Sequence, residues 1–286
     1  MSVTATNQVN LDEDSEALTV FTFWIGDELF AIDIANILSI TQDLDSLLKT
    51  PVKSKGLSGI INYLGNPVAV YNFAGMLSIP STRELKAGLV ELLDAREKDH
   101  VDWVNALEKS LKEDLPFDKA RDPHMCSFGK WYDKFETRDE ALSDIMARFD
   151  EPHKKIHALA DELLRLKESN KLELALEKLN VAQSTTLSSL KKHFTHARDQ
   201  INDSLHTVVI NITNDGSKPV VALQIDEIHE VMNFTKTDLI GLDQIGLDAI
   251  EGMDGYFRGY LGGEDNKSSC LLLDTENLLS NIKVPT

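Results

Sequence analysis

A helix-favouring block interrupts a chain whose two flanks favour β-strands. Residues 81–203 contain only two of the 15 glycines, Gly88 and Gly129, and are rich in Leu, Ala, Glu and Lys, which have high helix propensities. The flanks carry β-branched and aromatic runs, which favour strands. At 286 residues the chain is long enough for about two domains. We therefore predict an α+β protein in which a helical domain is inserted into a β-rich one.

Alternating apolar and β-branched residues predict strands separated by short turns in both flanks. Turn-forming residues lie at Gly26-Asp27, at Leu64–Pro67 and at Asn214–Gly216. The predicted strands cover residues 19–25 and 29–32, two stretches within 57–73, and residues 207–212 and 220–223.

A weak internal repeat relates the two flanks. Residues 30–37 align with residues 221–228 at an offset of 191, and the Tyr-Leu-Gly at 63–65 aligns with the Tyr-Leu-Gly at 260–262 at an offset of 197. We therefore predict two related β subdomains. The helical block would be inserted at their junction, because insertions are tolerated where both ends emerge at one exposed place.

Apolar spacing and proline positions in the block predict an antiparallel four-helix bundle. Pro116 and Pro123 break the pattern after the first long helix, and Pro152 lies where a new helix can begin, since proline at the first helical position loses no needed hydrogen bond. Short connections favour antiparallel neighbours. The predicted helices cover residues 83–114, a short stretch near 128–135, and residues 140–149, 152–167 and 172–201.

Four side chains in this block form a complete ligand set for zinc. His153 and His157 are spaced i,i+4, so both leave the same face of a helix one turn apart. His100 lies in the first predicted helix, and Cys126 begins the run Cys-Ser-Phe-Gly-Lys-Trp-Tyr. Because three imidazoles and one thiolate satisfy tetrahedral Zn²⁺, we predict that these four residues bind one zinc ion.

The ligand set favours regulation over hydrolysis. Lys154 follows His153, whereas zinc proteases carry a glutamate at that place. Four protein ligands also leave no bound water to activate. Zinc would hold Cys126 as the reactive thiolate, so its oxidation would remove a ligand and loosen the bundle. Side chains that could orient the imidazoles are Asp94, Asp102 and Glu151. His124, two residues before Cys126, could substitute as a ligand but is predicted to be a loop histidine, and His193 and His196 are predicted to be surface or packed residues.

Charge and cysteine content exclude several classes. A formal net charge of −18 argues against nucleic acid and anionic membranes as partners. The block carries 21 basic and 25 acidic residues, so the flanks hold most of the surplus. No apolar run is long enough to span a membrane, and no secretory signal opens the chain. Two cysteines, Cys126 and Cys270, are too few for a disulfide framework and indicate a reducing, cytoplasmic compartment.

The two flanks together resemble the CheW-like domain, the coupling module of bacterial chemotaxis. The resemblance rests on residues 23–34, 59–70 and 256–259. It implies two small five-stranded β-barrels that bridge chemoreceptor tips to the histidine kinase CheA. It also implies that partners dock at Ile37 and at the turn formed by Asn62, Leu64 and Gly65, where the family usually carries arginine in place of Leu64.

The inserted block resembles the chemoreceptor zinc-binding (CZB) domain. The Cys-x-Phe-Gly-x-Trp-Tyr run and the His-x-x-x-His pair are both present. The resemblance implies zinc bound by the same four residues in a four-helix bundle, and sensing of zinc availability or of oxidants. The chain then divides into a disordered segment at 1–17, CheW-like halves at 18–80 and 204–286, and the CZB-like insertion at 81–203.

We therefore predict a cytoplasmic chemotaxis adaptor without enzymatic activity, in which the zinc-binding bundle reports zinc or oxidant state to the coupling domain. Two alternatives remain open. A zinc-dependent enzyme would need an open coordination position and a nearby general base, and the sequence places no obvious base beside the ligands. An adaptor whose bundle is a purely structural homodimerisation unit would use the same four ligands.

Overall fold

The structure, a computed structural model, describes residues 17–42, 47–244, 255–262 and 269–282. The chain forms two compact units, one from residues 1–85 and 206–286 and the other from residues 86–205. The segment predicted to be disordered lies outside the described residues except for Ala17. Among the described helices, none is long and apolar enough to cross a membrane. The protein is a mixed α+β chain with its helical region in the middle, as predicted.

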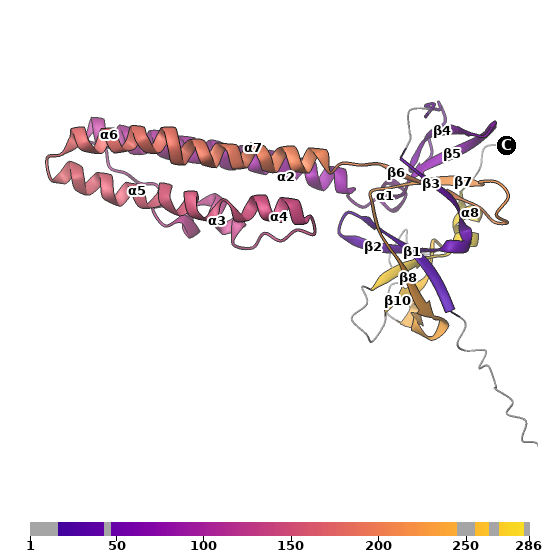
Figure 1. Cartoon of the computed structure of the whole chain (residues 1–286). Helices are drawn as coiled ribbons and strands as arrows, with labels where there is room; N and C mark the ends of the chain where they lie inside the picture. Colours follow the sequence, from indigo (N-terminus) through magenta and orange to yellow (C-terminus); the bar gives the residue numbers. More distant parts are fainter. Residues whose placement is uncertain (1–16, 43–46, 245–254, 263–268, 283–286) are drawn as a thin grey trace, which may run out of the picture. The chain divides into compact units, whose positions relative to one another are not determined.

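The first unit is built from strands and two short helices (Figure 1). Its strands are β1 (Ala17–Ile25), β2 (Glu28–Asp33), β3 (Ile37–Thr41), β4 (Leu57–Tyr63), β5 (Asn66–Asn72), β6 (Val208–Ile212), β7 (Val221–Ile225), β8 (Glu227–Thr235), β9 (Leu239–Ile240), β10 (Phe257–Leu261) and β11 (Cys270–Leu273). Its α-helices are α1 (Phe73–Leu77) and α8 (Thr275–Asn281), and short helical turns lie at Ile34–Asn36, Lys236–Asp238 and Leu242–Gln244.

The strands form two open sheets, so the prediction of two five-stranded barrels is wrong in its closure and in one strand count. One sheet has six strands in the order β8-β1-β2-β11-β10-β9, and the other has five in the order β3-β6-β7-β5-β4. Within the described ranges, no pairing joins the first and last strand of either sheet. The outer side of β4 is instead occupied by Leu48, which exchanges two backbone hydrogen bonds with Ile60.

Each sheet combines strands from both flanks, so the two flanks are not separate subdomains. The chain leaves the six-stranded sheet after β2, through a short turn at Ile34–Asn36, and enters the five-stranded sheet as β3. It makes the reverse crossing between β7 and β8, with Asp226 between the two strands. The aligned residues 30–37 and 221–228 lie at these two crossings. The internal repeat therefore marks two equivalent places at which the chain passes from one sheet to the other.

The strand orders follow the same repeat. Exchanging β1 with β6, β2 with β7, β3 with β8, β4 with β10 and β5 with β11 converts the order of one sheet into that of the other, apart from the two-residue β9 at one edge. The parallel pairs correspond too, since β5 pairs with β7 and β11 pairs with β2. A short helix follows the last strand of each copy. The helical block is inserted between the copies, after α1 and before β6.

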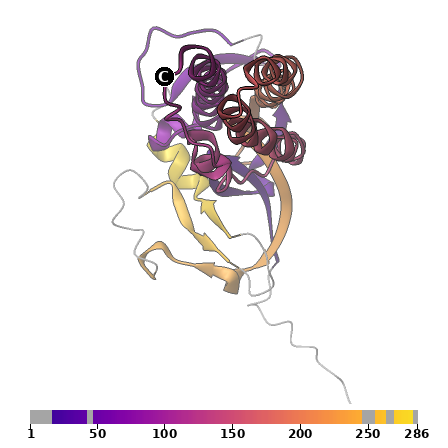
Figure 2. The ribbon, with the colours of Figure 1, turned by 90° about the vertical axis from the view of Figure 1, so that its left-hand side faces the viewer.

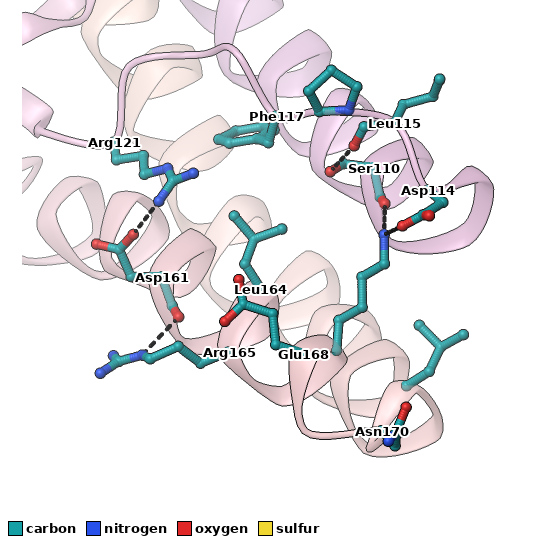
Figure 3. A pocket seen from close by; sticks show the side chains of 13 residues that line it. Ser110, Asp114, Leu115, Phe117, Arg121, Asp161, Leu164, Arg165, Glu168 and Asn170 are labelled. Atoms are coloured by element: carbon teal, nitrogen blue, oxygen red, sulfur yellow. Dashed lines mark hydrogen bonds and ion pairs between the residues drawn. The ribbon is translucent and has the colours of Figure 1, made fainter.

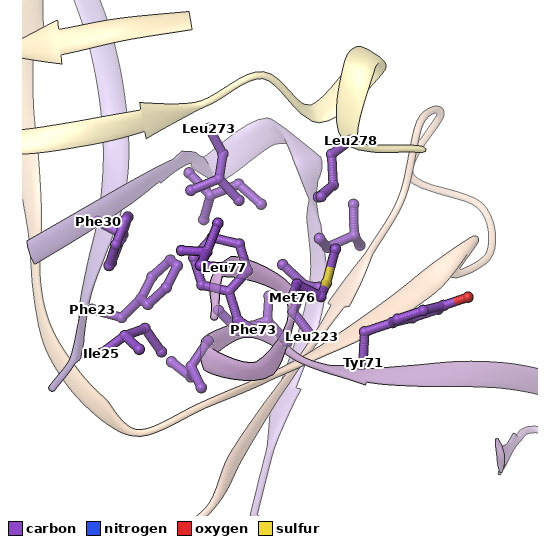
Figure 4. Close-up of a cluster of buried hydrophobic side chains, with 14 of the residues drawn as sticks. Phe23, Ile25, Phe30, Tyr71, Phe73, Met76, Leu77, Leu223, Leu273 and Leu278 are labelled. Carbon is purple, nitrogen blue, oxygen red and sulfur yellow. The ribbon is translucent and has the colours of Figure 1, made fainter. Parts of the chain in front are cut away.

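The two sheets share a large hydrophobic cluster, and each sheet also has a smaller cluster of its own. Phe23 and Phe30 from β1 and β2 contact Phe73 from α1, with ring centroids 5.8 Å and 5.3 Å from that of Phe73. Leu223 of β7 and Leu278 of α8 belong to the same buried cluster, as Figure 4 shows. Each copy of the repeat thus contributes a helix and strands to a common interior, and burial of this apolar surface holds the copies together.

The second unit is helical, and Figure 2 looks along its long helices. It contains α2 (Thr82–Glu113, which begins in the first unit), α3 (Ser127–Tyr132), α4 (Glu140–Ala147), α5 (Asp150–Glu168), α6 (Leu172–Ala182) and α7 (Ser188–Asp203). A π-helical turn at Gln183–Leu187 joins α6 to α7. Pro152 lies in the first turn of α5, where its missing N–H breaks no helical hydrogen bond.

Candidate metal centre

The structure brings the four predicted ligand residues together. His100 lies on α2, Cys126 is the N-cap residue of α3, and His153 and His157 lie one turn apart on α5. One ligand atom from each side chain lies within 4.8 Å of all the others. The Cys126 Sγ is 3.3 Å from the His153 Nε2. Three helices that are distant in sequence thus converge on one point.

Burial at this point leaves polar atoms that need a partner. His100, His153 and His157 are 4%, 4% and 1% exposed, whereas Cys126 is half-buried. The Nε2 atoms of His100 and His157 are fully buried and have no hydrogen-bond partner in the protein. Because a buried polar atom without a partner costs free energy, a cation shared by these atoms is the natural way to satisfy them.

Backbone carbonyls orient two of the imidazoles. The Nδ1 of His100 lies 2.7 Å from the Arg96 carbonyl oxygen, and the Nδ1 of His157 lies 3.1 Å from the Ala120 carbonyl oxygen. In the tautomer that donates both bonds, each Nε2 carries a free lone pair for a metal ion. The carboxylates predicted to orient the imidazoles form ion pairs with cationic side chains instead. Asp94 pairs with Arg198, Asp102 with Lys98, and Glu151 with Lys155.

The local fold of the Cys126 segment holds its sulfur in position beside the histidines. A turn at Pro123–Met125 leads into α3, and the Gly129 backbone N–H donates to the Cys126 Sγ at 3.1 Å. Burial raises the pKa of the Cys126 thiol, while backbone N–H groups of Gly129 and Phe128 act in the opposite direction. A bound divalent cation would outweigh the effect of burial and keep the sulfur as thiolate.

The imidazoles are neutral at physiological pH. Burial lowers the pKa of His153 to about 3, with the positive charges that His100 and His157 would carry as further causes. Burial, followed by His100, lowers the pKa of His157 to about 4. Burial also lowers the pKa of His100. Since a metal ion binds neutral imidazole, the histidines need lose no proton at pH 7 to serve as ligands.

Comparisons with known proteins bear on this geometry. Residues 100–164 match the family model described as a chemoreceptor zinc-binding domain. This range begins at His100 and includes Cys126, His153 and His157. The segment matches the chemoreceptor zinc-binding domain. The resemblance drawn from the sequence is therefore confirmed over these residues, which make up less than a quarter of the chain.

Two further comparisons concern the whole chain. Among solved structures it is similar to the scaffolding protein TtCheW from Thermoanaerobacter tengcongensis, with 10% sequence identity and a TM-score of 0.39, over 90% of this chain and 89% of that chain. No curated protein matches the chain.

The spacing of the four donor atoms is compatible with a bound zinc ion. Tetrahedral zinc, with bonds of about 2.0–2.1 Å to nitrogen and 2.3 Å to sulfur, places its donor atoms roughly 3.3–3.7 Å apart. The observed separations, up to 4.8 Å, approach these values. Within the described part of the chain, no other group of three or more His, Cys, Asp or Glu could share an ion. His124 pairs with Asp133 instead, and neither His193 nor His196 joins the cluster.

The indole of Trp103 supports the same carbonyl that orients His157, a role that was not predicted from the sequence. The buried Trp103 donates its indole N–H to the Ala120 carbonyl oxygen at 2.7 Å. Its ring centroid lies 5.0 Å from that of His157. The spacing of Trp103 three residues after His100, on the same helical face, was the available signal, but the carbonyl it meets belongs to a loop whose path the sequence does not reveal.

We predict that Trp103→Phe weakens zinc binding about tenfold or more, because loss of a group that orients a metal ligand typically lowers affinity by 10–100-fold. Phenylalanine keeps most of the apolar contact but leaves the Ala120 carbonyl with one donor instead of two. Competition titration with a fluorescent zinc chelator measures the change. Trp131→Phe is the control, since Trp131 packs on Phe128 and Phe135 and should leave affinity unchanged. Equal effects of the two substitutions would contradict this role.

Zinc affinity should rise with pH in a way that reports only the thiol. Between about pH 7.5 and pH 9 the imidazoles are neutral, since their pKa values lie below the ordinary 6.5, while the pKa of Cys126 lies above the ordinary 9.0. Binding then releases one proton, so the logarithm of the affinity should increase by about one per pH unit. Titration calorimetry in buffers of different ionisation enthalpy counts the protons. Release of two or more would show that imidazoles are protonated in the free protein.

The helical unit also contains a pocket that lies away from the four ligand residues. It has a volume of about 1100 Å³ and lies between the loop after α2 and the end of α5, as Figure 3 shows. Its charged groups pair with one another: Arg121 contacts Asp161 at 2.8 Å, and Lys167 contacts Asp114 at 2.7 Å. None of the four ligand residues lines it, so size alone does not identify the chemical centre of this protein.

The predicted partner-binding residues lie in the β unit. Asn62, Leu64 and Gly65 form the hairpin between β4 and β5, in which the Asn62 side chain accepts a hydrogen bond from the Gly65 N–H at 2.8 Å. Leu64 and Gly65 both have positive φ, 49° and 88°, as a two-residue hairpin turn requires. Leu64 is 86% exposed. Ile37 begins β3, where it is half-buried against the shared core.

Proposed function

We propose that this protein is a cytoplasmic chemotaxis adaptor whose helical unit binds one zinc ion and reports zinc or oxidant state to a CheW-like coupling domain. The observation that carries the proposal is the convergence of His100, Cys126, His153 and His157, whose ligand atoms lie within 4.8 Å of one another. The match of residues 100–164 to a chemoreceptor zinc-binding domain supports the signalling context. In this proposal, the insertion at 81–203 is a four-helix bundle, and residues 18–80 and 204–286 form the coupling domain.

The state of Cys126 is the proposed signal. It is the one ligand that keeps solvent exposure, since the three histidines are almost fully buried. The sulfur also ties α3 to α5, through the 3.3 Å approach to His153. Oxidation of the thiolate, or loss of the ion, removes the bond that joins these helices. Packing at the centre then loosens where α2, α3 and α5 meet.

We further propose that the protein is not an enzyme. Four protein ligands fill a tetrahedral zinc sphere and leave no position for a substrate or an activated water. The carboxylates nearest to the centre along α2 are held in ion pairs, Asp99 with Arg96 and Asp102 with Lys98. A general base poised beside the metal is therefore lacking among these groups.

Helix α2 offers a mechanical link between the ion and the sheets. The Thr82 backbone N–H, at the start of the helix, donates to the Asp226 carboxylate at 2.5 Å. The same carboxylate accepts the N–H of Gly26, from the β1–β2 turn, at 3.2 Å. Asp226 lies at the crossing from β7 to β8. A displacement of α2, which carries His100, would therefore act on a residue at which the chain passes from one sheet to the other.

The docking surfaces are proposed from the resemblance to CheW-like domains. Chemoreceptor tips and a CheA-type kinase would contact Ile37 and the hairpin at Asn62–Gly65. The exposed Leu64 at the tip of the hairpin gives an apolar contact where the family usually has arginine, which would favour an apolar surface on the partner.

The test combines zinc content with partner binding. Elemental analysis of the purified full chain should give one zinc per chain, and pull-downs with receptor-tip and kinase fragments should differ between zinc-loaded and chelator-treated protein. Cys126→Ala should behave like the treated protein, and Cys270→Ala is the matched control, because Cys270 is buried in β11 of the other unit. Asp226→Asn should retain zinc but lose the dependence of partner binding on zinc.

Other results would favour other functions. A purified chain without zinc overturns the site. Zinc that changes the sedimentation of the protein without changing partner binding indicates a structural dimerisation unit. Zinc-dependent hydrolysis that survives in a three-ligand variant indicates an enzyme with an open position.

A further inference from the structure

A small pocket opens onto the metal centre. It has a volume of about 300 Å³ and is lined by residues of α2, the loop before α3, α3 itself, and α5. Three of the four ligand residues line it, namely His100, Cys126 and His157. The buried Nε2 atoms of His100 and His157 are the ones without a partner in the protein. The pocket therefore reaches the side chains that would hold the ion, while these two Nε2 atoms are closed off from solvent.

Aromatic rings pack around the centre, and one of them, that of Phe128, also lines the pocket. The Phe128 ring centroid lies 5.5 Å from that of His100 and 4.9 Å from that of His153. The Phe194 centroid lies 5.8 Å from that of His100. Phe128 and Phe194 are at most 1% exposed, so no water-sized molecule passes where they pack. Access to the ion is thereby directed to the side of the pocket.

Of the ligands that line the pocket, only Cys126 keeps solvent exposure. An incoming donor atom can therefore approach the ion beside the sulfur more readily than beside either buried imidazole. Release of Cys126 from an ion would also require less movement of the fold than release of a histidine. Cys126 lies at the start of a six-residue helix, whereas the histidines lie within long helices.

We propose that this pocket is a binding site for small chelating molecules, through which zinc enters and leaves with the Cys126 sulfur as the first ligand exchanged. The inference rests on the proposed zinc site and adds its route of exchange. On the loaded protein, a nitrogen or oxygen donor of the chelator would take the place of the Cys126 sulfur, which would keep the electron pair of its former bond and take a proton from water. The probe is 1,10-phenanthroline, a small chelator that has nitrogen donors and no thiol.

The two sides of one ion pair provide a matched test. Asp102 lines the pocket, whereas its partner Lys98, at 2.6 Å, does not. Asp102→Phe and Lys98→Phe both break the pair on the exposed side of α2, but only the first places a ring at the pocket. Zinc transfer from the loaded full chain to 1,10-phenanthroline should be slowed about tenfold by Asp102→Phe and left unchanged by Lys98→Phe. In the wild type the rate should increase in proportion to the chelator concentration.

A second pair of residues lies on α3. Ser127 lines the pocket and Lys130 does not, and both are exposed residues of α3. Ser127→Trp should slow the transfer and Lys130→Trp should not. The proposal is overturned if neither pocket variant that retains zinc is slower than its control, or if the wild-type rate does not depend on chelator concentration. Zinc missing from the purified wild type would instead overturn the proposed function, so the two failures are distinguishable.

Discussion

Cys126→Ala should lower the zinc affinity of this protein by about a hundredfold or more. Structural zinc sites contribute roughly 10–16 kcal/mol of binding free energy, so the loss of one of four ligands removes on the order of 3 kcal/mol. The three remaining ligands are imidazoles on α2 and α5, and the position left by the sulfur would be filled by water. Competition with a chelator of known affinity measures the change.

The same substitution separates the roles of the two units. Zinc at a hundredfold excess over its dissociation constant stabilises the folded state by about 2.7 kcal/mol, and this should appear as a rise in the melting temperature of the helical unit on zinc addition. Cys126→Ala should lose most of that rise, whereas Cys270→Ala, whose thiol is 1% exposed in the β unit, should retain it. A zinc-dependent rise of the same size in both variants would refute the assignment of Cys126 as a ligand.

The metal centre was predictable because its ligands follow local rules. The i,i+4 spacing of His153 and His157 places both on one face of any helix, and Cys126 supplies the soft donor that zinc prefers among the nearby residues. Their orientation was not predictable. Carboxylates were expected to orient the imidazoles, but the partners of His100 and His157 are backbone carbonyls. Every residue carries a backbone carbonyl, so the sequence does not indicate which carbonyl contacts a given histidine.

The sheets show a similar division between local and global information. Strand patterns and the hairpin turn at 64–65 follow from alternation and turn chemistry. Which sheet a strand joins depends on the short connections after β2 and β7. Each sends the chain to the other sheet, and no periodicity encodes that choice. The repeat between the flanks was real, but it relates interleaved copies: they share one large buried cluster, and each sheet, built from strands of both copies, has a smaller buried cluster of its own.

Gly129→Ala should destabilise the helical unit by about 1–3 kcal/mol or more and weaken zinc binding with it. A Cβ at this position would lie 1.9 Å from the Pro123 carbonyl oxygen and 3.0 Å from the Cα of His124. Both contacts are backbone atoms of the turn that leads into Cys126, so relief of the overlap must move the turn. The Gly129 N–H also donates to the Cys126 sulfur, and displacement of either partner disturbs the ligand.

Gly88→Ala is the matched control and should have the opposite sign. Gly88 lies within α2, and a Cβ there meets nothing within 4 Å, so alanine should stabilise the helix by about 0.5–1 kcal/mol through its higher propensity. Urea denaturation followed by helix-specific circular dichroism, with zinc present and after chelation, measures both variants. If Gly129→Ala matched Gly88→Ala in stability and zinc content, the close approach of Pro123 to Gly129 would not be a constraint on the site. The glycine of the Cys-x-Phe-Gly run would then need another explanation.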